Sequence, residues 1–427
     1  MPKPDNIYDE LAWRGLIFQE SGQGELKKYL SENKVSLYCG FDPTGDSLHI
    51  GSLVPLITLR RFQEYGHTAL PLAGGATGMI GDPSGKSAER NLLTADDVRH
   101  NVECIKEQLK SIVDFESGNA ELVNNFDWIS KINIIEYLRD IGKNFSVNVM
   151  MQKDSVKSRL QGAEAGISYT EFSYMILQGY DFLHLNREKN CTLQIGGSDQ
   201  WGNMTAGMDL IRRCTDSESY CLTVPLITKS DGSKFGKTAS GAIWLDSAKT
   251  CPYEFYQYWI NTPDADVIRF LKYFTFLNEE VIDELEKEMA EAAHLRSAQK
   301  KLAYEMTQMI HGEEETQKAI NASAALFDKN GDVTVVDART LESLHQTTEG
   351  KAYETLKEVA GLLQILQETG LASSGREARQ FIKSNAVSMN NEKITEETFK
   401  PSSDDLLHGK YLVLKRGKKG FSVVKFG

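Results

Sequence analysis

The stretch that decides the fold is Ser36-Leu-Tyr-Cys-Gly-Phe-Asp-Pro-Thr-Gly-Asp-Ser-Leu-His-Ile-Gly-Ser52. Its apolar start, residues 37–39, predicts a buried strand, and residues 42–45 (Asp-Pro-Thr-Gly) predict a turn. Leucine and phenylalanine residues then recur at helical spacing from Leu53, so a helix is expected to begin near His49. Ligands of α/β proteins bind at the carboxyl ends of strands, and a helix N-terminus favours phosphate groups. The stretch therefore predicts an α/β fold with a ligand site after this strand.

Composition is typical of a globular enzyme. The 427 residues predict two or three domains, and 41% apolar with 25% charged residues fit a folded protein. The polar N-terminus is not a signal peptide pattern, and no apolar run is long enough for a membrane span, so no membrane partner is expected. The six cysteines form no close pairs, which argues against a zinc site and favours a reducing, cytoplasmic location. The net charge of −12 does not exclude RNA, because RNA needs only a local basic patch.

The strand, turn and helix pattern occurs again further along the chain. Residues 191–195 (Cys-Thr-Leu-Gln-Ile) predict a strand that runs into a glycine turn with Asp199. Residues 68–86 predict another strand and a glycine-rich loop. In a ligand cleft, Asp82 of this loop would face an ammonium while Lys86 and Arg90 would approach phosphates. A surface turn with solvated charges is the alternative.

A helix is predicted over residues 168–187, with Ser168 or Thr170 as its N-cap. Tyr174, Gln178 and Asp181 are spaced i, i+4, i+7 and therefore share one helical face. A buried face of this kind needs a hydrogen-bonding ligand, whereas an exposed face needs none.

Two lysines follow the predicted strand at residues 221–228. Lys234 and Lys237 are spaced i, i+3, and Thr238 adds a hydroxyl. Ammonium groups on a glycine-containing loop can stabilise charge that develops on a departing phosphate. A solvated lysine turn is the alternative.

These motifs together resemble a known family. His49-Ile-Gly-Ser52 is similar to the His-Ile-Gly-His signature of class I aminoacyl-tRNA synthetases, with serine at the fourth position, and Lys234-Phe-Gly-Lys-Thr238 is similar to their Lys-Met-Ser-Lys-Ser loop. The segment Tyr38–Thr44 resembles bacterial-type tyrosyl-tRNA synthetases, and the resemblance extends over essentially the whole chain. It implies an α/β protein with a Rossmann-like parallel-sheet catalytic domain, an α-helical domain and a small α+β C-terminal RNA-binding domain.

The resemblance also implies domain limits and partners. The catalytic domain is expected at residues 1–230 with a dimer-forming insertion at about 120–165, and the lysine loop with the helical domain at 231–325. A linker at 326–357 and the RNA-binding domain at 358–427 would follow. ATP is expected as a substrate with Mg²⁺ and no protein-ligated metal, and the partners would be L-tyrosine, tRNA(Tyr) and a second copy of the chain. The apolar stripe Ile134, Ile135, Leu138 and Ile141 of the insertion is, by its pattern alone, more typical of core than of an interface.

Site residues carry over from the family by position. Tyr174 and Gln178 with Asp82 would hold the α-ammonium of tyrosine, and Tyr38 and Asp181 would bond its phenolic hydroxyl. A substrate without that hydroxyl would leave both groups unpaired. The full implied set comprises the tyrosine-binding residues Tyr38, Asp82, Tyr174, Gln178, Asp181 and Gln200; the ATP-binding residues Cys39, Asp42, Gly51, Ser52, Gly197, Asp199 and Thr238; and the catalytic residues His49, Thr44, Lys86, Arg90, Lys234 and Lys237.

The last seventy residues predict a separate module. Residues 366–382 read as helix, turn, helix, and residues 386–394 as a hairpin around Asn-Asn. From Lys410 to Gly427 there are six basic residues and no acidic one. The residues expected to meet RNA phosphates are Arg376, Arg379, Lys383, Lys415 and Arg416. A solubilising basic tail is the alternative.

Two other functions remain open. A tryptophan-specific relative is disfavoured by Asp181 with Tyr38, because an indole carries no phenolic hydroxyl. A non-catalytic RNA-binding paralogue is disfavoured by the presence of both loop lysines, His49 and Asp199.

Overall fold

The structure, a computed structural model, describes residues 4–427 except 23, 85–91, 163–165, 231, 233–234, 239–240, 328–330, 349 and 418–419. The chain forms two compact units. The first comprises residues 1–237, 242–246 and 263–298, and the second comprises residues 238–241, 247–262 and 299–427.

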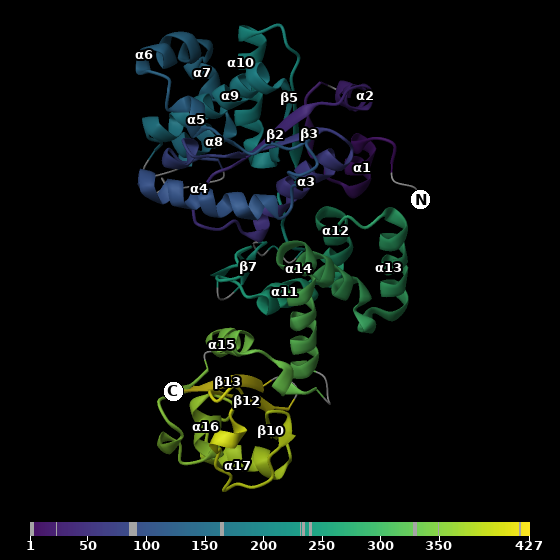
Figure 1. The fold of residues 1–427 in the computed structure, drawn as a ribbon, viewed down its shortest axis with the longest axis vertical. Helices are drawn as coiled ribbons and strands as arrows, with labels where there is room; N and C mark the ends of the chain where they lie inside the picture. The colour runs from purple at the N-terminus through teal and green to yellow at the C-terminus, as the bar shows by residue number, and fades with distance from the viewer. Residues whose placement is uncertain are drawn as a thin grey trace. The chain divides into compact units, whose positions relative to one another are not determined.

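A six-stranded sheet forms the centre of the first unit (Figure 1). Its strands in spatial order are β1 (Gln19–Glu20), β6 (Tyr220–Val224), β5 (Cys191–Gly197), β2 (Ser36–Phe41), β3 (Thr68–Ala73) and β4 (Val123–Asn124). All neighbours are parallel except β1 and β6. The chain proceeds from β2 to β3 in one direction and from β5 to β6 in the other. The boundary between β2 and β5 is therefore the switch point at which open α/β sheets bind ligands.

The strands expected from the apolar runs are confirmed. β3 is buried at five of its six positions and β2 at four of six, including three in a row, which explains why their sequences read as apolar runs without alternation. After β2 the chain turns through the short 3-10 helix η1 (Ile50–Ser52) into α3 (Leu53–Glu64), which packs against β2 and β3.

Two long helices pack on each other beside β5: α9 (Tyr169–Lys189) and α10 (Trp201–Cys214). The expected cap of α9 is Ser168, whose side chain accepts from the backbone N–H of Glu171 at 3.2 Å. The helices approach closely at Gly207, where an added Cβ would lie 3.4 Å from the Cα of Gly179. This contact holds α9 against α10, and both helices also contact β5.

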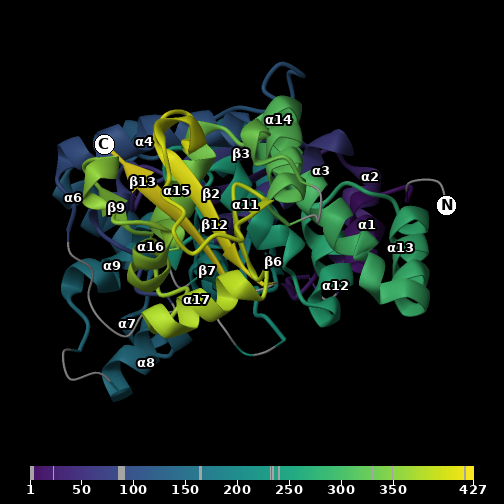
Figure 2. The ribbon, with the colours of Figure 1, turned by 90° about the horizontal axis from the view of Figure 1, so that it is seen from below.

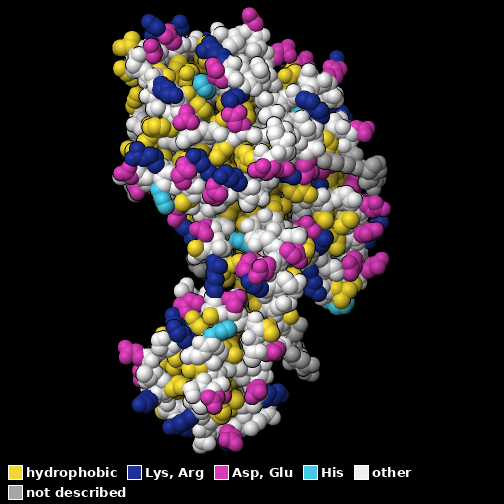
Figure 3. All heavy atoms as spheres, viewed as in Figure 1, with side chains coloured by type: hydrophobic (Ala, Val, Ile, Leu, Met, Phe, Trp, Pro, Cys, Tyr) yellow, Lys and Arg dark blue, Asp and Glu magenta, His cyan; other side chains and the backbone are white. Residues whose placement is uncertain are grey.

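The other helices that precede α9 are α1 (Ile7–Arg14), α2 (Glu25–Glu32), α4 (Ala95–Lys110), α5 (Phe126–Ile129), α6 (Ile134–Glu136), α7 (Val147–Met150) and α8 (Asp154–Gly162). The interpretation of the 134–141 stripe as core is wrong for three of its four residues. Ile134, Ile135 and Leu138 are 65%, 64% and 50% exposed, and only Ile141 is buried. Figure 3 shows hydrophobic side chains at the surface at the edge where Figure 1 places α6. In the described part of the single chain, these three side chains are therefore largely exposed to solvent.

The helical stretch predicted from residue 250 onward is present and contributes to both units. Helices α12 (Asp264–Phe274) and α13 (Glu279–Ala292) belong to the first unit, whereas α11 (Pro252–Ile260) and most of α14 (Ser297–Phe327) belong to the second.

The end of the second unit is built on a five-stranded sheet (Figures 1 and 2). Its strands in spatial order are β11 (Glu392–Lys393), β10 (Val387–Met389), β12 (Tyr411–Arg416), β13 (Gly420–Phe426) and β9 (Ala352–Tyr353). Helices α16 (Leu362–Glu368) and α17 (Gly375–Lys383) share its core. The predicted hairpin is confirmed, and Asn390 and Asn391 turn it with positive φ angles.

The stretch 326–357, expected to be an irregular linker, carries ordered elements in its described part. Helix α15 (Ala338–Thr347) packs against β13, and β9 pairs with β13 in parallel. Glu342 of α15 accepts hydrogen bonds from Tyr411 at 2.6 Å and Lys425 at 2.9 Å. These bonds tie α15 to the C-terminal sheet.

Candidate active site

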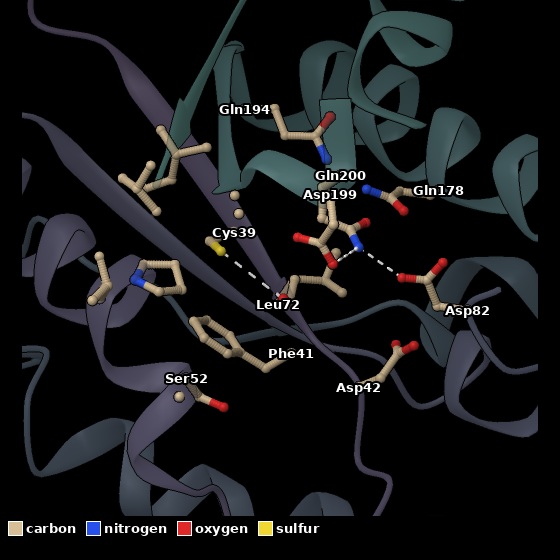
Figure 4. Close-up of a pocket in the computed structure, with 18 of the residues that line it drawn as sticks. Cys39, Phe41, Asp42, Ser52, Leu72, Asp82, Gln178, Gln194, Asp199 and Gln200 are labelled. Atoms are coloured by element: carbon tan, nitrogen blue, oxygen red, sulfur yellow. Dashed lines mark hydrogen bonds between the residues drawn. The ribbon is translucent and has the colours of Figure 1, made fainter. Parts of the chain in front are cut away.

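A cavity of about 310 Å³ opens at the carboxyl ends of β2 and β5 (Figure 4). It lies at the switch point of the sheet. Thirteen predicted site residues line it: Tyr38, Cys39, Asp42, Thr44, Gly51, Ser52, Asp82, Tyr174, Gln178, Asp181, Gly197, Asp199 and Gln200. The sheet thus brings together residues that are up to 162 positions apart in the chain, as Tyr38 and Gln200 are.

One end of the cavity holds a buried phenol and a buried carboxylate. The Tyr38 hydroxyl is buried and has no hydrogen-bond partner among the described residues. Asp181 is 2% exposed, and its two oxygens accept from Asn125 Nδ2 at 3.0 Å and Trp128 Nε1 at 2.8 Å. These two bonds orient the Asp181 carboxylate, and each oxygen keeps a lone pair that can accept from a further donor.

Burial raises the pKa of Asp181 to about 7. The hydrogen bonds from Asn125 and Trp128 oppose this shift, because they stabilise the ionised form, and the nearby charge of Asp42 adds to it. Burial also raises the pKa of the Tyr38 hydroxyl well above its ordinary value, with Asp181 contributing in the same direction. Tyr38 therefore stays protonated and can donate a hydrogen bond.

Asp42, which follows β2, is bonded to the polar face of α9. The Tyr174 hydroxyl donates to Asp42 Oδ2 at 2.7 Å, and the Thr77 hydroxyl donates to Oδ1 at 2.7 Å. Burial and the charges of Asp42 and Asp82 raise the pKa of Tyr174 well above its ordinary value. Asp42 was assigned to ATP by resemblance, and in the structure it also holds a residue assigned to tyrosine.

Asp82 faces the same space from the glycine-rich loop. Its Oδ2 accepts from Gln200 Nε2 at 2.7 Å, a bond drawn in Figure 4, and its Oδ1 accepts from the backbone of Ser84 at 2.9 Å. The Gln178 Oε1 atom is buried without a partner within the described part of the chain. The predicted ammonium-binding set of Asp82, Tyr174 and Gln178 thus lines one cavity and includes an unpaired acceptor.

His49 caps the turn that starts α3. Its Nδ1 accepts from the backbone N–H of Gly51 at 3.0 Å, and the ring is exposed. Gly51 and Ser52 line the cavity, whereas His49 is not among its lining residues. This hydrogen bond within the turn makes His49 the N-cap of η1.

The lysine-loop motif is partly described. Gly236 lies against the His-Ile-Gly turn, since a Cβ added to it would lie 3.1 Å from Ile50 Cγ1. Its carbonyl accepts from Ile243 N, and the Ile243 carbonyl accepts from Ile50 N, both at 3.0 Å. The two signatures are therefore adjacent. Lys86, Arg90 and Lys234 lie outside the described residues, as do the side chains of Lys237 and Thr238.

Cys39 lies beside Asp199 on the cavity wall. Burial, with a smaller contribution from Asp199, raises the pKa of the Cys39 thiol to about 12, so the thiol is neutral and not a nucleophile. Over the ranges described, no group of three or more His, Cys, Asp or Glu side chains is arranged to hold a metal ion. Likewise, no described helix is both long and apolar enough to cross a membrane.

Four polar residues of the site were missed in the sequence. Asn125 and Trp128 orient Asp181, Thr77 bonds Asp42, and Gln194 lines the cavity with a buried Oε1 that has no partner within the described ranges. Trp128 lies on the four-residue helix α5 and Asn125 directly before it, and a helix of this length is too short to show periodicity. Gln194 interrupts the apolar run of β5, and a polar residue inside a buried strand was the one available signal.

The predicted RNA-binding residues of the C-terminal module differ in exposure. Arg376, Arg379 and Lys383 are exposed on α17, although Arg379 and Lys383 both approach Glu397, at 3.7 and 3.1 Å. Lys415 instead donates to Asn391 Oδ1. Arg416 donates to the Leu371 carbonyl at 2.9 Å and covers the Phe381 ring. Of the five predicted residues, the three on α17 are therefore exposed, whereas Lys415 and Arg416 are partly buried.

Comparison with known proteins gives the same assignment over the whole chain. Residues 30–328 match the family model "tRNA synthetases class I (W and Y)", and residues 344–424 match "Tyrosine--tRNA ligase SYY-like C-terminal domain". The chain is 51% identical to tyrosine--tRNA ligase 1 of Bacillus subtilis (strain 168) and 49% identical to tyrosine--tRNA ligase 2 of Bacillus anthracis, with 99% of this chain and 99% and 100% of theirs covered. Among solved structures it is similar to the C-terminally truncated mitochondrial tyrosyl-tRNA synthetase of Aspergillus nidulans, with 31% identity, a TM-score of 0.69, and 76% and 95% of the two chains covered. The chain therefore belongs to the tyrosine–tRNA ligase family of class I tRNA synthetases.

Proposed function

We propose that this chain activates L-tyrosine with ATP and transfers the tyrosyl group to the terminal adenosine of tRNA(Tyr). The observation that carries the proposal is the Tyr38 hydroxyl, which is buried beside Asp181 without a partner in the described structure. A buried polar group of this kind is costly unless a ligand satisfies it. The phenolic hydroxyl of tyrosine can donate to Asp181 and accept from Tyr38, whereas phenylalanine and tryptophan offer no hydroxyl.

The amino group of tyrosine would bind at the opposite side of the same space. Asp82 and the Gln178 Oε1 atom are acceptors there, and Tyr174 is held in place by its bond to Asp42. An ammonium provides three donors for these groups. The carboxylate of tyrosine would then point toward the turn that carries Gly51 and Ser52.

ATP would occupy the part of the cavity at the start of α3. Gly51 and Ser52 lie in the first turn there, and backbone N–H groups at a helix start favour phosphate. Gly197 allows the Asp199 carboxylate to lie close to the backbone, since a Cβ at Gly197 would be 2.6 Å from Asp199 Oδ1. Asp199 is then available to the ribose hydroxyls, and Cys39, Asp42 and Thr44 complete the wall of this part of the cavity.

The remaining catalytic roles rest on the sequence. We assign the stabilisation of pyrophosphate to Lys234, Lys237 and Thr238 with Lys86 and Arg90, and the positioning of ATP to His49. Mg²⁺ bound to ATP would neutralise phosphate charge. Because Mg²⁺ in such sites keeps several waters and is held largely by substrate phosphates, the proposal includes no protein-ligated metal. Catalysis would then consist of positioning and electrostatic stabilisation, without a covalent enzyme intermediate.

A homodimer is the second part of the proposal. Large apolar side chains are exposed along the insertion and at Tyr169, just after it: Phe126, Ile134, Ile135, Leu138, Val147, Val149, Met151, Leu160 and Tyr169. Four of them, Val147, Met151, Leu160 and Tyr169, line one hollow of the surface. Exposed apolar surface of this kind usually marks an interface. A second copy of the chain is the partner expected to cover this surface.

The C-terminal module would bind tRNA phosphates through Arg376, Arg379 and Lys383.

Charging of tRNA tests the proposed function directly. The purified chain is incubated with tRNA(Tyr), labelled tyrosine and Mg²⁺, with and without ATP. Tyrosyl-tRNA is expected only with ATP. Folded protein that binds the tRNA but never charges it would contradict the proposal and favour a non-catalytic RNA-binding paralogue.

A further inference from the structure

The chain that leads into the lysine loop is bonded to helix α12. The Thr228 carbonyl accepts from Arg269 Nη2 at 2.7 Å. Ser230 donates to Asp266 Oδ2 twice, from its backbone N–H at 3.1 Å and from its hydroxyl at 2.9 Å. The Asp266 side chain is only 1% exposed and also pairs with Arg269 at 2.6 Å. A buried carboxylate with three donors in place has a fixed orientation, so this attachment is rigid.

An aromatic residue attaches the loop to the same helix a few residues later. The Phe235 ring stacks on Phe274, with centroids 5.4 Å apart and planes 12° from parallel. It also meets Phe270 edge-on at 5.3 Å and 77°. Phe270 and Phe274 are spaced i, i+4 on α12 and are buried. Phe235 is the residue between Lys234 and Gly236, so the stacking acts inside the motif itself.

Helix α12 is in turn fixed to helix α3. Arg61 of α3 donates to the Thr275 carbonyl at 2.7 Å, and Arg14 donates to the same carbonyl at 3.0 Å and to Leu277 O at 2.7 Å. Both guanidinium groups are buried, and positive charge at the C-terminal end of a helix is favourable. Helix α12 is therefore bonded to the last turn of α3, the helix that begins after the His-Ile-Gly turn.

We propose that Asp266, Phe270 and Phe274, here called the α12 anchor, are positioning residues that fix the lysine loop relative to the His-Ile-Gly turn for the departure of pyrophosphate. The inference rests on the proposed function. Ammonium groups stabilise a developing charge only when they are already placed where it develops. The anchor contacts neither subsite of the cavity, so it is expected to act on the rate of adenylate formation and not on tyrosine binding.

The experiment is tyrosine-dependent ATP–pyrophosphate exchange by the full-length chain carrying Phe235→Leu, Phe274→Leu or both. Leucine keeps the apolar contact and removes the ring stacking. The matched control is Phe18→Leu, which changes an exposed phenylalanine of the same unit. Tyrosine affinity without ATP and the melting temperature are measured for every variant. Ser230→Ala and Asp266→Asn, singly and together, test the other attachment.

The inference predicts that Phe235→Leu lowers kcat about 3- to 10-fold while tyrosine affinity changes less than about 2-fold. The double variant should be no slower than the slower single variant, because the two rings act through one contact. Three results would overturn the inference: losses in kcat that multiply in the double variant, a loss in tyrosine affinity as large as the loss in kcat, or an unchanged kcat. Inactivity of the unmodified chain would instead overturn the proposed function. If Phe274→Leu does not fold, the Ser230–Asp266 pair gives the same test.

Discussion

Trp128 Nε1 donates a 2.8 Å hydrogen bond to Asp181 Oδ1. The bond joins the insertion to helix α9, since Trp128 lies on α5 and Asp181 on α9. The indole ring is also stacked on His184, with centroids 4.5 Å apart. The carboxylate that is expected to identify tyrosine is therefore oriented by a residue from the same insertion that carries the exposed apolar surface.

Replacement of Trp128 by phenylalanine should weaken tyrosine recognition. Trp128→Phe keeps an aromatic ring against His184 and removes the N–H donor to Asp181. A hydrogen bond to a charged group contributes about 1.5–3 kcal/mol, so the preference for tyrosine over phenylalanine should fall by about 10- to 160-fold. The measurement is kcat/KM for both amino acids in pyrophosphate exchange. Trp13→Phe, which lies outside the cavity, is the control, and an unchanged preference in Trp128→Phe would contradict the role.

Tyr38→Phe should change selectivity and stability in opposite directions. The Tyr38 hydroxyl has no partner in the described structure, so its removal costs no hydrogen bond in the free protein. The free energy of unfolding should stay equal or rise, whereas the preference for tyrosine over phenylalanine should fall by about 2- to 12-fold, the value of one neutral hydrogen bond. Urea unfolding and exchange kinetics measure the two effects. A clear loss of stability with unchanged selectivity would show that the hydroxyl has a structural partner.

The pKa of Asp181 predicts a pH dependence of stability. Its value is about 7 in the folded chain against 3.8 for an ordinary aspartate. Between these values the folded state keeps a proton that the unfolded state has lost. Stability should therefore fall as pH rises from about 4 to about 7, by at most about 1.4 kcal/mol per pH unit. Unfolding curves of the unmodified chain and of Asp181→Asn test this. As pH rises, the free energy of unfolding of the unmodified chain should fall relative to that of the variant. If the difference between the two does not change with pH, the pKa of Asp181 is not raised in the folded chain.

A charge in the apolar surface of the insertion should separate the proposed dimer. Ile135→Glu leaves folding of the single chain intact because the side chain is already 64% exposed. Burying an unpaired carboxylate in an interface costs several kcal/mol, so the variant should sediment as a monomer. Val335→Glu, at another exposed apolar position, should behave as the unmodified chain does. Identical sedimentation of the unmodified chain and Ile135→Glu would mean that this surface is not the interface.

Neutralising the exposed charges of α17 should affect tRNA and spare adenylation. Arg379→Gln with Lys383→Gln should weaken tRNA binding and lower the salt slope of log K by about 1 to 2. Pyrophosphate exchange should stay unchanged, since it needs no tRNA. Lys300→Gln with Lys301→Gln changes the same number of charges on α14 as a control. Equal effects of both pairs would indicate a general charge effect without a site.

The sequence predicted the strands and the cavity well because local signals were strong. The buried runs of β2 and β5 read as apolar strands, and the i, i+4, i+7 spacing of Tyr174, Gln178 and Asp181 placed all three at the cavity. The glycine turns after two strands predicted a ligand site at the carboxyl ends of strands, and the cavity lies at the ends of β2 and β5.

The parts that were not predicted depend on contacts between distant segments. Trp128 and Asn125 reach Asp181 only because α5 packs on α9, and no spacing within the chain encodes that contact. The stripe at residues 134–141 has the same pattern whether core or a partner covers it, so periodicity could not distinguish the two. In the same way, the strand β9 has only two residues, and its pairing with β13 depends on the whole C-terminal sheet.

The most direct test of the proposed tyrosine site is ATP–pyrophosphate exchange, measured with tyrosine, phenylalanine and tryptophan on the unmodified chain and on Tyr38→Phe. We expect exchange with tyrosine alone, and a reduced preference for tyrosine over phenylalanine in the variant. Exchange that favours tryptophan, or no exchange with any amino acid from folded protein, would contradict the proposed site.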